Sequence, residues 1–156
     1  MSFNLENITR ENVKGLKPYS SARDEYVSDG SEMVFLDANE NPFENGVNRY
    51  PDPQQRNLKV LLAEQKGISP ENILLGNGSE EVLDLLFRAF CEPKEDNIIT
   101  LPTTYGMYKV LCGINCVENR EVLLNKDFQP DIEAILKHLD KQTKLLFICS
   151  PNNPTG

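Results

Sequence analysis

A glycine turn between a short apolar run and an amphipathic helix constrains the fold of this 156-residue chain more than any other feature. Residues 73–75 are apolar, residues 76–78 read Gly-Asn-Gly, and a helical pattern begins at Ser79. Apolar side chains then recur at intervals of three and four, at Val82, Leu83, Leu86, Phe87 and Phe90. Such spacing is typical of one buried helix face. The stretch therefore predicts a strand, a tight turn and a helix in succession.

This turn is a candidate anion site. Ser79 takes the N-cap position of the helix, and Gly76 and Gly78 let the backbone turn tightly and let a ligand approach closely. A helix N-terminus with unpaired N–H groups favours a phosphate. Glu80 and Glu81 would repel a phosphate if they pointed at it, so backbone amides would have to bind it. An ordinary strand–helix loop with a good cap explains the same residues equally well.

Several other classes are excluded by the sequence. The dinucleotide fingerprint needs a third glycine where Glu81 stands, and no Gly-Lys-Ser/Thr of a Walker loop follows. A net charge of −8 without a basic run argues against nucleic acid and anionic membrane surfaces. No apolar run has membrane-spanning length, and the N-terminus lacks the features of a secretion signal. We therefore expect a cytoplasmic protein.

The cysteines do not form a metal-binding pattern. They lie at Cys91, Cys112, Cys116 and Cys149, and the single histidine is distant from the pair at 112 and 116. Zinc sites normally combine close pairs of cysteine or histidine ligands. We expect no metal site and four reduced thiols with packing roles, Cys149 being buried within an apolar run.

Strands alternate with helices along the chain, which predicts an α/β fold with a mostly parallel sheet and helices on both faces. The expected strands are residues 33–36, 73–75, 98–101, 116–117, 121–124 and 145–149. The last of these is continuously apolar, as is typical of a strand covered on both faces. Residues 16–23 carry too little apolar surface for a core, and they are expected to form an arm that docks on another surface, such as a second subunit.

Three further helices are expected. One has Asp52 as N-cap and Pro53 as its first residue, and Gly67 ends it. A second follows residues 102–106 and carries Met107, Val110 and Leu111. A third starts at Asp131, and its expected inner face consists of Ile132, Ile135, Leu136 and Leu139.

Three loops are expected at one edge of the sheet, beyond the carboxyl ends of the strands, where α/β proteins bind ligands. They are residues 76–81, 102–106 and 150–156. A flat, phosphorylated cofactor would suit them: the helix N-terminus would hold its phosphate, Tyr105 would stack on its ring, and Asn153 would hydrogen-bond a ring substituent. Singly, Tyr105 could be a surface-helix aromatic and Asn153 a turn former before Pro154.

The loop at residues 150–156, Ser-Pro-Asn-Asn-Pro-Thr-Gly, resembles that of the fold-type I pyridoxal-phosphate aminotransferases. Three more motifs narrow the resemblance to the histidinol-phosphate aminotransferases, and together they cover essentially the whole chain. These motifs are residues 17–23 (Lys-Pro-Tyr-Ser-Ser-Ala-Arg), 37–42 (Asp-Ala-Asn-Glu-Asn-Pro) and 49–51 (Arg-Tyr-Pro).

The resemblance implies a role for each matching position on the cofactor side of the site. The backbone at Gly78, Ser79 and Glu80 would bind the phosphate of pyridoxal phosphate. Tyr105 would stack on the pyridine ring, and Asn153 would hydrogen-bond the phenolic oxygen.

Three further positions would act in a homodimer or on the substrate. Tyr50 would reach across the dimer interface to the phosphate of the partner's cofactor. Tyr19 would hold the substrate phosphate, and Asn41 would lie beside the substrate. The implied reaction moves an amino group between L-histidinol phosphate and 2-oxoglutarate, which becomes glutamate; in cells it runs in reverse, within histidine biosynthesis.

Members of this family are more than twice as long as the chain. The part that has no counterpart here carries the lysine that forms the Schiff base, the aspartate that pairs with the pyridine nitrogen, and the substrate-reading arginines. The resemblance thus implies half a site, no catalytic residue in this chain and no activity of the chain alone. It also implies an arm with small-domain and dimer contacts at residues 1–50, followed by an incomplete large domain at residues 51–156.

Other interpretations stay open. Another aminotransferase of the same subgroup, specific for aromatic amino acids, or a phosphothreonine decarboxylase-like enzyme, would carry similar motifs. A chain that only associates with other chains, without catalysis, is the alternative from a different class.

Overall fold

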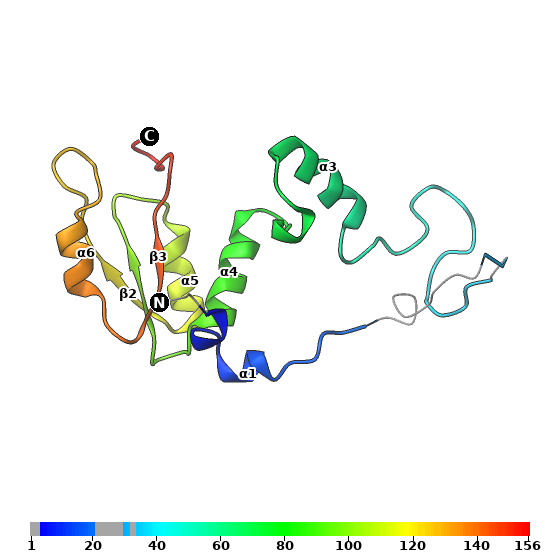
Figure 1. The fold of residues 1–156 in the computed structure, drawn as a ribbon, viewed down its shortest axis with the longest axis horizontal. Helices are drawn as coiled ribbons and strands as arrows, with labels where there is room; N and C mark the ends of the chain where they lie inside the picture. Colours follow the sequence, from blue (N-terminus) through cyan, green and yellow to red (C-terminus); the bar gives the residue numbers. More distant parts are fainter. Residues whose placement is uncertain (1–3, 21–29, 32–33) are drawn as a thin grey trace. The chain divides into compact units, whose positions relative to one another are not determined.

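The structure is a computed structural model that describes residues 4–20, 30–31 and 34–156. The chain divides into two compact units, one formed by Met1–Leu16 with Gly76–Gly156 and the other by Lys17–Leu75. Figure 1 shows their helices and strands and labels most of them. The expected domain boundary after residue 50 stays a prediction.

The larger unit is built on a three-stranded parallel sheet with the order β2-β1-β3. The strands are β1 (Asn97–Thr100), β2 (Glu118–Glu121) and β3 (Thr143–Phe147). Ile98 of β1 is in register with Asn119 of β2 and Leu145 of β3. The predicted parallel sheet is confirmed.

Helices cover both faces of this sheet (Figure 1), as predicted. They are α4 (Ser79–Phe90), α5 (Met107–Asn115) and α6 (Ile132–His138). Successive residues of a strand point to opposite faces, and β1 is buried throughout. Ile98 accordingly packs with Phe87 of α4 and Leu111 of α5, whereas Ile99 packs with Ile135 of α6.

The N-terminal segment lies against the end of α4. It contains a 3-10 turn, η1 (Leu5–Asn7), and a short helix, α1 (Glu11–Lys14). The amide of Arg10 donates to the carbonyl oxygen of Ala89 at 3.0 Å. This bond uses one of the carbonyls that a helix leaves unpaired at its C-terminus.

The unit Lys17–Leu75 contains α3 (Arg56–Lys66) and η2 (Pro70–Asn72). Gly67 ends α3 in the left-handed conformation (φ 67°), as predicted. The predicted start is wrong, because α3 begins at Arg56. The carboxylate of Asp52 accepts from the amides of Gln54 and Arg56, at 2.9 and 2.8 Å. Asp52 therefore forms a turn of its own before the helix, and Pro53 stays outside it.

Two predicted strands are absent from the described part of the chain. Residues 34–36 and 73–75 have no strand pairing, and Met33 lies outside the described residues. Leu36 is 89% exposed and Leu74 60% exposed. A strand requires a hydrogen-bonded neighbour, and every described strand belongs to the other unit.

Other predictions were right in kind but wrong in detail. β2 covers residues 118–121 and so shares only Glu121 with the runs expected at 116–117 and 121–124, and β3 begins two residues before the expected 145. The prediction that the last strand is covered on both faces is wrong, because Phe147 is buried on one face of β3 but Leu146 is 39% exposed on the other. Helix α5 is confirmed, although Val110 is half exposed.

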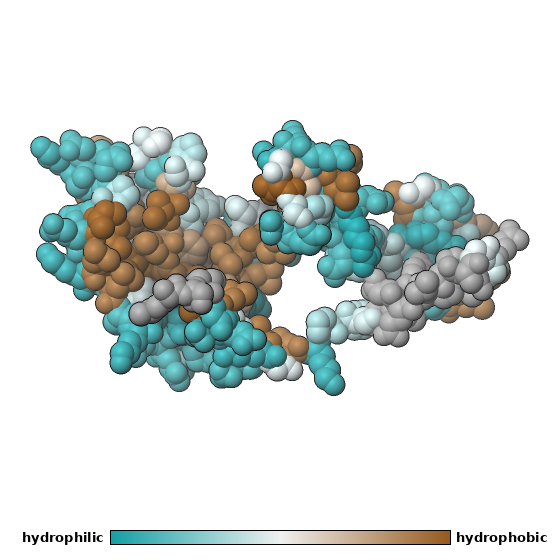
Figure 2. Space-filling view, in the orientation of Figure 1, coloured by the Kyte–Doolittle hydropathy of each residue, from teal (hydrophilic) through white to brown (hydrophobic). Residues whose placement is uncertain are grey.

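The expected inner face of α6 is mostly outside. Ile135 is buried, but Ile132, Leu136 and Leu139 are 62%, 61% and 43% exposed. Figure 2 shows apolar side chains gathered on the surface of the sheet-containing unit.

No helix in the described part of the chain is both long and apolar enough to cross a membrane.

The thiols are unpaired, and two of them are buried. Cys91 and Cys112 lie in the core between the sheet and α4 and α5. Burial raises the pKa of Cys91 to about 12 and that of Cys112 to about 11. Cys149 is only partly buried, and Cys116 is exposed, so the packing roles expected for all four apply best to the first two.

Candidate functional site

The turn before α4 requires glycine at two positions. Gly78, the N-cap residue, has φ 86° and ψ 167°, a conformation essentially reserved for glycine. A Cβ at Gly76 would lie 2.9 Å from both Oε2 of Glu81 and Cγ2 of Val82. Ser79 is the first residue of the helix and makes no capping bond, so its prediction as N-cap is wrong by one position.

Two carboxylates lie at this helix end. Glu81 accepts a hydrogen bond from the amide of Asn77, and Glu80 accepts one from the hydroxyl of Tyr105. The Tyr105 hydroxyl, followed by Glu80's own amide, lowers the pKa of the Glu80 carboxyl. Both side chains thus bind groups of the turn and of the next loop. Gly78 and Ser79 are exposed beside them, and the amide of Gly78 donates to the carbonyl oxygen of Gly76 at 3.0 Å.

Tyr105 is the outer member of a row of aromatic rings. Its ring meets that of Tyr108 edge-on, with centroids 5.8 Å apart and planes at 89°. Tyr108 stacks on Phe147 at 4.6 Å, and Phe147 on Phe87 at 5.6 Å. The row joins the loop at residues 102–106 to the core. The hydrogen bond to Glu80 raises the pKa of the Tyr105 phenol, which therefore stays a neutral donor.

Asn152 joins the second loop to the third. Its Oδ1 accepts from Oγ1 of Thr104 at 2.8 Å, and its Nδ2 donates to the carbonyl of Thr103 at 2.9 Å and to Oγ1 of Thr155 at 2.7 Å. The neighbouring Asn153 is exposed. Sequence reasoning chose Asn153 and missed Asn152, because both fit a turn and spacing alone does not show which one bridges.

The three loops expected at one edge of the sheet therefore do come together. The Tyr105–Glu80 bond links residues 102–106 to residues 76–81, and Asn152 links residues 102–106 to residues 150–156. Of the predicted cofactor residues, Gly78, Ser79, Glu80, Tyr105 and Asn153 all lie in this loop cluster. Their individual roles stay predictions.

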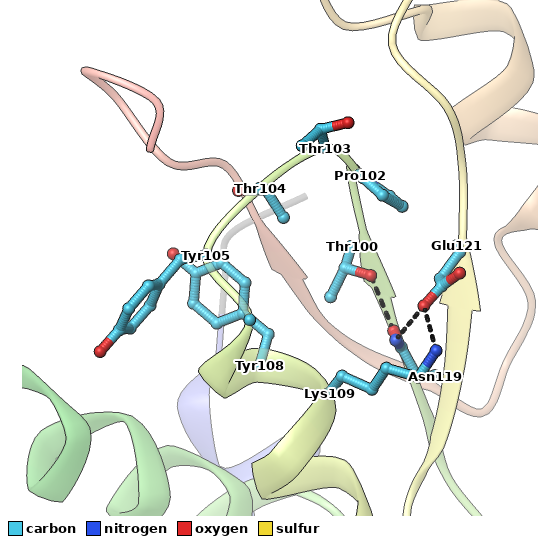
Figure 3. A pocket seen from close by; sticks show the side chains of 10 residues that line it. Thr100, Pro102, Thr103, Thr104, Tyr105, Tyr108, Lys109, Asn119 and Glu121 are labelled. Carbon is cyan, nitrogen blue, oxygen red and sulfur yellow. Dashed lines mark hydrogen bonds and ion pairs between the residues drawn. The ribbon is translucent and has the colours of Figure 1, made fainter. Parts of the chain in front are cut away.

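A hollow of about 270 Å³ lies beside Tyr105, near the ends of β1 and β2 (Figure 3). Lys109 points into this region, and its Nζ lies 3.1 Å from Oε1 of Glu121. Oγ1 of Thr100 donates to Oδ1 of Asn119 at 2.8 Å, and Nδ2 of Asn119 donates to Glu121 at 3.3 Å. These polar groups satisfy one another, and the charge of Lys109 is balanced by Glu121.

The other predicted site residues belong to the unit Lys17–Leu75. Tyr19 is 92% exposed and Tyr50 66% exposed. Oδ1 of Asn41 accepts from the amide of Phe43 at 3.0 Å. Residues 21–23 of the Lys-Pro-Tyr-Ser-Ser-Ala-Arg motif lie outside the described residues. The roles of Tyr19, Asn41 and Tyr50 stay predictions.

Two sequence motifs of that unit are joined by Glu40. Its side chain is only 3% exposed, and its carboxylate accepts from Nη1 of Arg49 at 3.0 Å and from the amide of Tyr50 at 2.8 Å. Glu40 is part of the motif at residues 37–42, but the sequence alone predicted no role for it. The contact fixes the backbone at Tyr50 relative to residues 37–42.

Comparisons with known proteins agree with this architecture. The chain is 69% identical over 154 residues to the histidinol-phosphate aminotransferase of Christiangramia forsetii, covering 99% of this chain and 44% of that protein. It is 67% identical over 156 residues to that of Flavobacterium johnsoniae, covering 99% and 45%. The crystal structure of tyrosine aminotransferase from Leishmania infantum matches with a TM-score of 0.62 and 26% identity, over 70% of this chain and 33% of that one.

The chain thus spans less than half the length of the curated relatives that it matches. Residues 31–156 match the family described as Aminotransferase class I and II. Because this match covers most of the chain, the chain belongs to the class I and II aminotransferase family.

Proposed function

We propose that this chain provides the first part of a histidinol-phosphate aminotransferase, which transfers an amino group between L-histidinol phosphate and 2-oxoglutarate. The observation that carries the proposal is the Tyr105–Glu80 hydrogen bond, because it places an aromatic ring at the glycine turn that begins α4. The names of the relatives support the choice of substrate.

The loop cluster fits pyridoxal phosphate in three respects. Gly78, with its positive φ, is the N-cap of α4 and puts no side chain of its own at this helix end, where backbone amides can bind a phosphate. The ring of Tyr105 offers a flat apolar face for a pyridine ring. The exposed amide of Asn153 can donate to a phenolic oxygen. When bound, this cofactor supplies the electron sink that amino transfer needs.

The chain's own groups would bind and orient that cofactor. Backbone amides at Gly78, Ser79 and Glu80 would hold the phosphate. For this the Gly78 amide would leave the carbonyl oxygen of Gly76, and the Glu80 carboxylate would release its own amide while it keeps the hydroxyl of Tyr105. The Glu81 carboxylate would stay on the amide of Asn77, since a carboxylate turned to the phosphate would repel it. We propose no catalytic lysine in the described loop cluster. The lysine that forms the Schiff base would lie in the region that the relatives have and that this chain does not cover.

The protein is further proposed to be a homodimer in the cytoplasm. Tyr50 would contact the phosphate of the cofactor in the partner subunit, Tyr19 would hold the substrate phosphate, and Asn41 would lie beside the substrate. The exposure of Tyr19 and Tyr50 supports roles at a surface that another molecule covers.

The test is an assay of the protein at the length of its relatives. Histidinol phosphate and phenylalanine are offered separately as amino donors to 2-oxoglutarate, and glutamate formation is measured. We expect kcat/KM to be higher for histidinol phosphate. A preference for phenylalanine would favour an aromatic aminotransferase, and release of carbon dioxide from phosphothreonine would favour the decarboxylase alternative.

A further inference from the structure

Tyr105 is restrained from two directions by side chains of different elements. Its hydroxyl donates to the carboxylate of Glu80 in the first turn of α4, and its ring makes a T-shaped contact with the ring of Tyr108 in α5. Figure 3 shows the Tyr105 ring extending from the loop with its hydroxyl directed away from the hollow. A tyrosine side chain has only two main rotatable bonds, so two contacts of this kind define its position.

Tyr108 alone cannot hold the hydroxyl end of the ring. The T-shaped contact with Tyr108 restrains one side of the Tyr105 ring. It does not reach the hydroxyl, so it does not by itself fix the torsion angles of the Tyr105 side chain. A hydrogen bond to an ionised acceptor is roughly twice as strong as one between neutral groups. The carboxylate of Glu80, which hydrogen bonding keeps charged, supplies that stronger restraint.

We propose that Glu80 is a positioning residue for Tyr105, holding its ring beside the N-terminus of α4 in the orientation that a bound cofactor ring would meet. This inference rests on the proposed function for its cofactor part, but the contact itself belongs to this chain alone. It gives the side chain of Glu80 a role that is separate from that of its backbone amide.

Glu81 provides a matched comparison. It is the same residue type in the same helical turn, and it carries the same charge close to the same helix end. Its carboxylate, however, accepts from the amide of Asn77 and not from Tyr105. A general electrostatic effect at the helix end would make both glutamates matter, whereas positioning of Tyr105 requires Glu80 alone.

The first experiment observes Tyr105 directly, without cofactor. The protein at the length of its relatives is labelled with 13C at Cζ of tyrosine, and the Tyr105 signal is assigned by its loss in Tyr105→Phe. Across an alkaline titration we expect Glu80→Ala to lower the pKa of the Tyr105 phenol and Glu81→Gln to leave it in place. An unchanged Tyr105 signal and titration in Glu80→Ala would overturn the inference.

The second experiment separates positioning from charge. Removing Glu80 also removes a negative charge near the proposed phosphate, which by itself would strengthen binding. The dissociation constant of pyridoxal phosphate is therefore measured for wild type, Glu80→Ala, Tyr105→Phe and the double variant. We expect a coupling of roughly threefold to tenfold, the size expected for one hydrogen bond, and partial rescue by Glu80→Gln, whose amide oxygen still accepts.

Strictly additive effects of the two substitutions would overturn the inference. A wild-type protein that binds no pyridoxal phosphate would refute the proposed function, while the nuclear magnetic resonance titration would still decide the Glu80–Tyr105 contact. Coupling between the substitutions at Glu80 and Tyr105, in a protein that does not use histidinol phosphate, would support the inference and refute the proposed substrate.

Discussion

The guanidinium of Arg10 binds the carboxylate of Glu92 through two nitrogens, with Nε 2.9 Å from Oε2 and Nη2 3.2 Å from Oε1. Its third nitrogen, Nη1, donates to the carbonyl oxygen of Arg88 at 3.0 Å. The Arg10 side chain is 18% exposed, so this pair is better shielded than an ordinary surface pair. It attaches the N-terminal segment to the C-terminal end of α4.

Replacing Arg10 by lysine should loosen this attachment, because an ammonium group cannot reproduce the planar fork. We expect the free energy of unfolding to fall by about 1 kcal/mol and the amides of α1 to exchange faster with deuterium. The control is Arg56→Lys, in an exposed pair with Asp52 that solvent screens and that should contribute little to stability. Equal losses in both variants would contradict the importance of the fork.

Gly78→Ala should destabilise the protein by about 1–3 kcal/mol, because a Cβ is strained at φ 86° and ψ 167°. The control is Gly113→Ala, in the last turn of α5, where the residue is exposed and a Cβ would meet nothing within 4 Å. That change should stabilise the protein by about 0.5–1 kcal/mol. Urea unfolding of both variants checks the pair, and a neutral Gly78→Ala would show that the turn relaxes.

Stability should depend on Asp140 in acid. Hydrogen bonds from Asn97 and Arg120 lower the pKa of its carboxyl from 3.8 to about 2. Because the folded state then binds protons less readily than the unfolded chain, the stabilisation is complete above about pH 4 and is lost as the pH falls towards 2. Urea unfolding between these pH values should show a steeper loss for wild type than for Asp140→Asn. Parallel curves would exclude Asp140 as the cause.

The 156-residue chain by itself should associate with copies of itself. Among the described strands β3 has only β1 as a neighbour, and Leu146 and Ile148 are 39% and 57% exposed. An uncovered apolar edge strand pairs readily with another chain. Light scattering should show oligomers that Leu146→Lys reduces. A wild-type chain that stays monomeric at high concentration would refute this.

The same chain should not transaminate. Amino transfer with pyridoxal phosphate needs a lysine amine that is unprotonated and close to the cofactor, and Lys109, which lines the hollow near Tyr105, is paired with Glu121. Incubation with pyridoxal phosphate, a donor and 2-oxoglutarate should yield no glutamate, and borohydride should trap no single lysine. One trapped lysine with measurable turnover would place the catalytic group within this chain.

Regular elements with a buried face could be predicted from the sequence. The spacing of apolar residues located α4 correctly, and the apolar run at 98–101 became β1 with a shift of one residue. The run at 73–75 looks equally suitable, yet it forms no strand here. Its apolar side chains favour burial, but a strand also needs a neighbouring strand to pair with its backbone N–H and C=O groups.

The loop cluster could be predicted only in outline. Topology brought residues 76–81, 102–106 and 150–156 to one edge, and the structure agrees. The bonds that hold them together join residues 25 and 48 positions apart, Tyr105 with Glu80 and Thr104 with Asn152. Such contacts depend on the final side-chain directions, which composition and spacing do not contain.

The bridge made by Asn152 has a consequence for protein engineering. Because one side chain bonds Thr103, Thr104 and Thr155 together, neither loop can be redesigned as if the other were a fixed background. A library that randomises residues 102–106 but keeps Asn152 would favour loop conformations that still form hydrogen bonds with the Asn152 side chain. Libraries that vary both loops jointly would search a much larger set of site shapes.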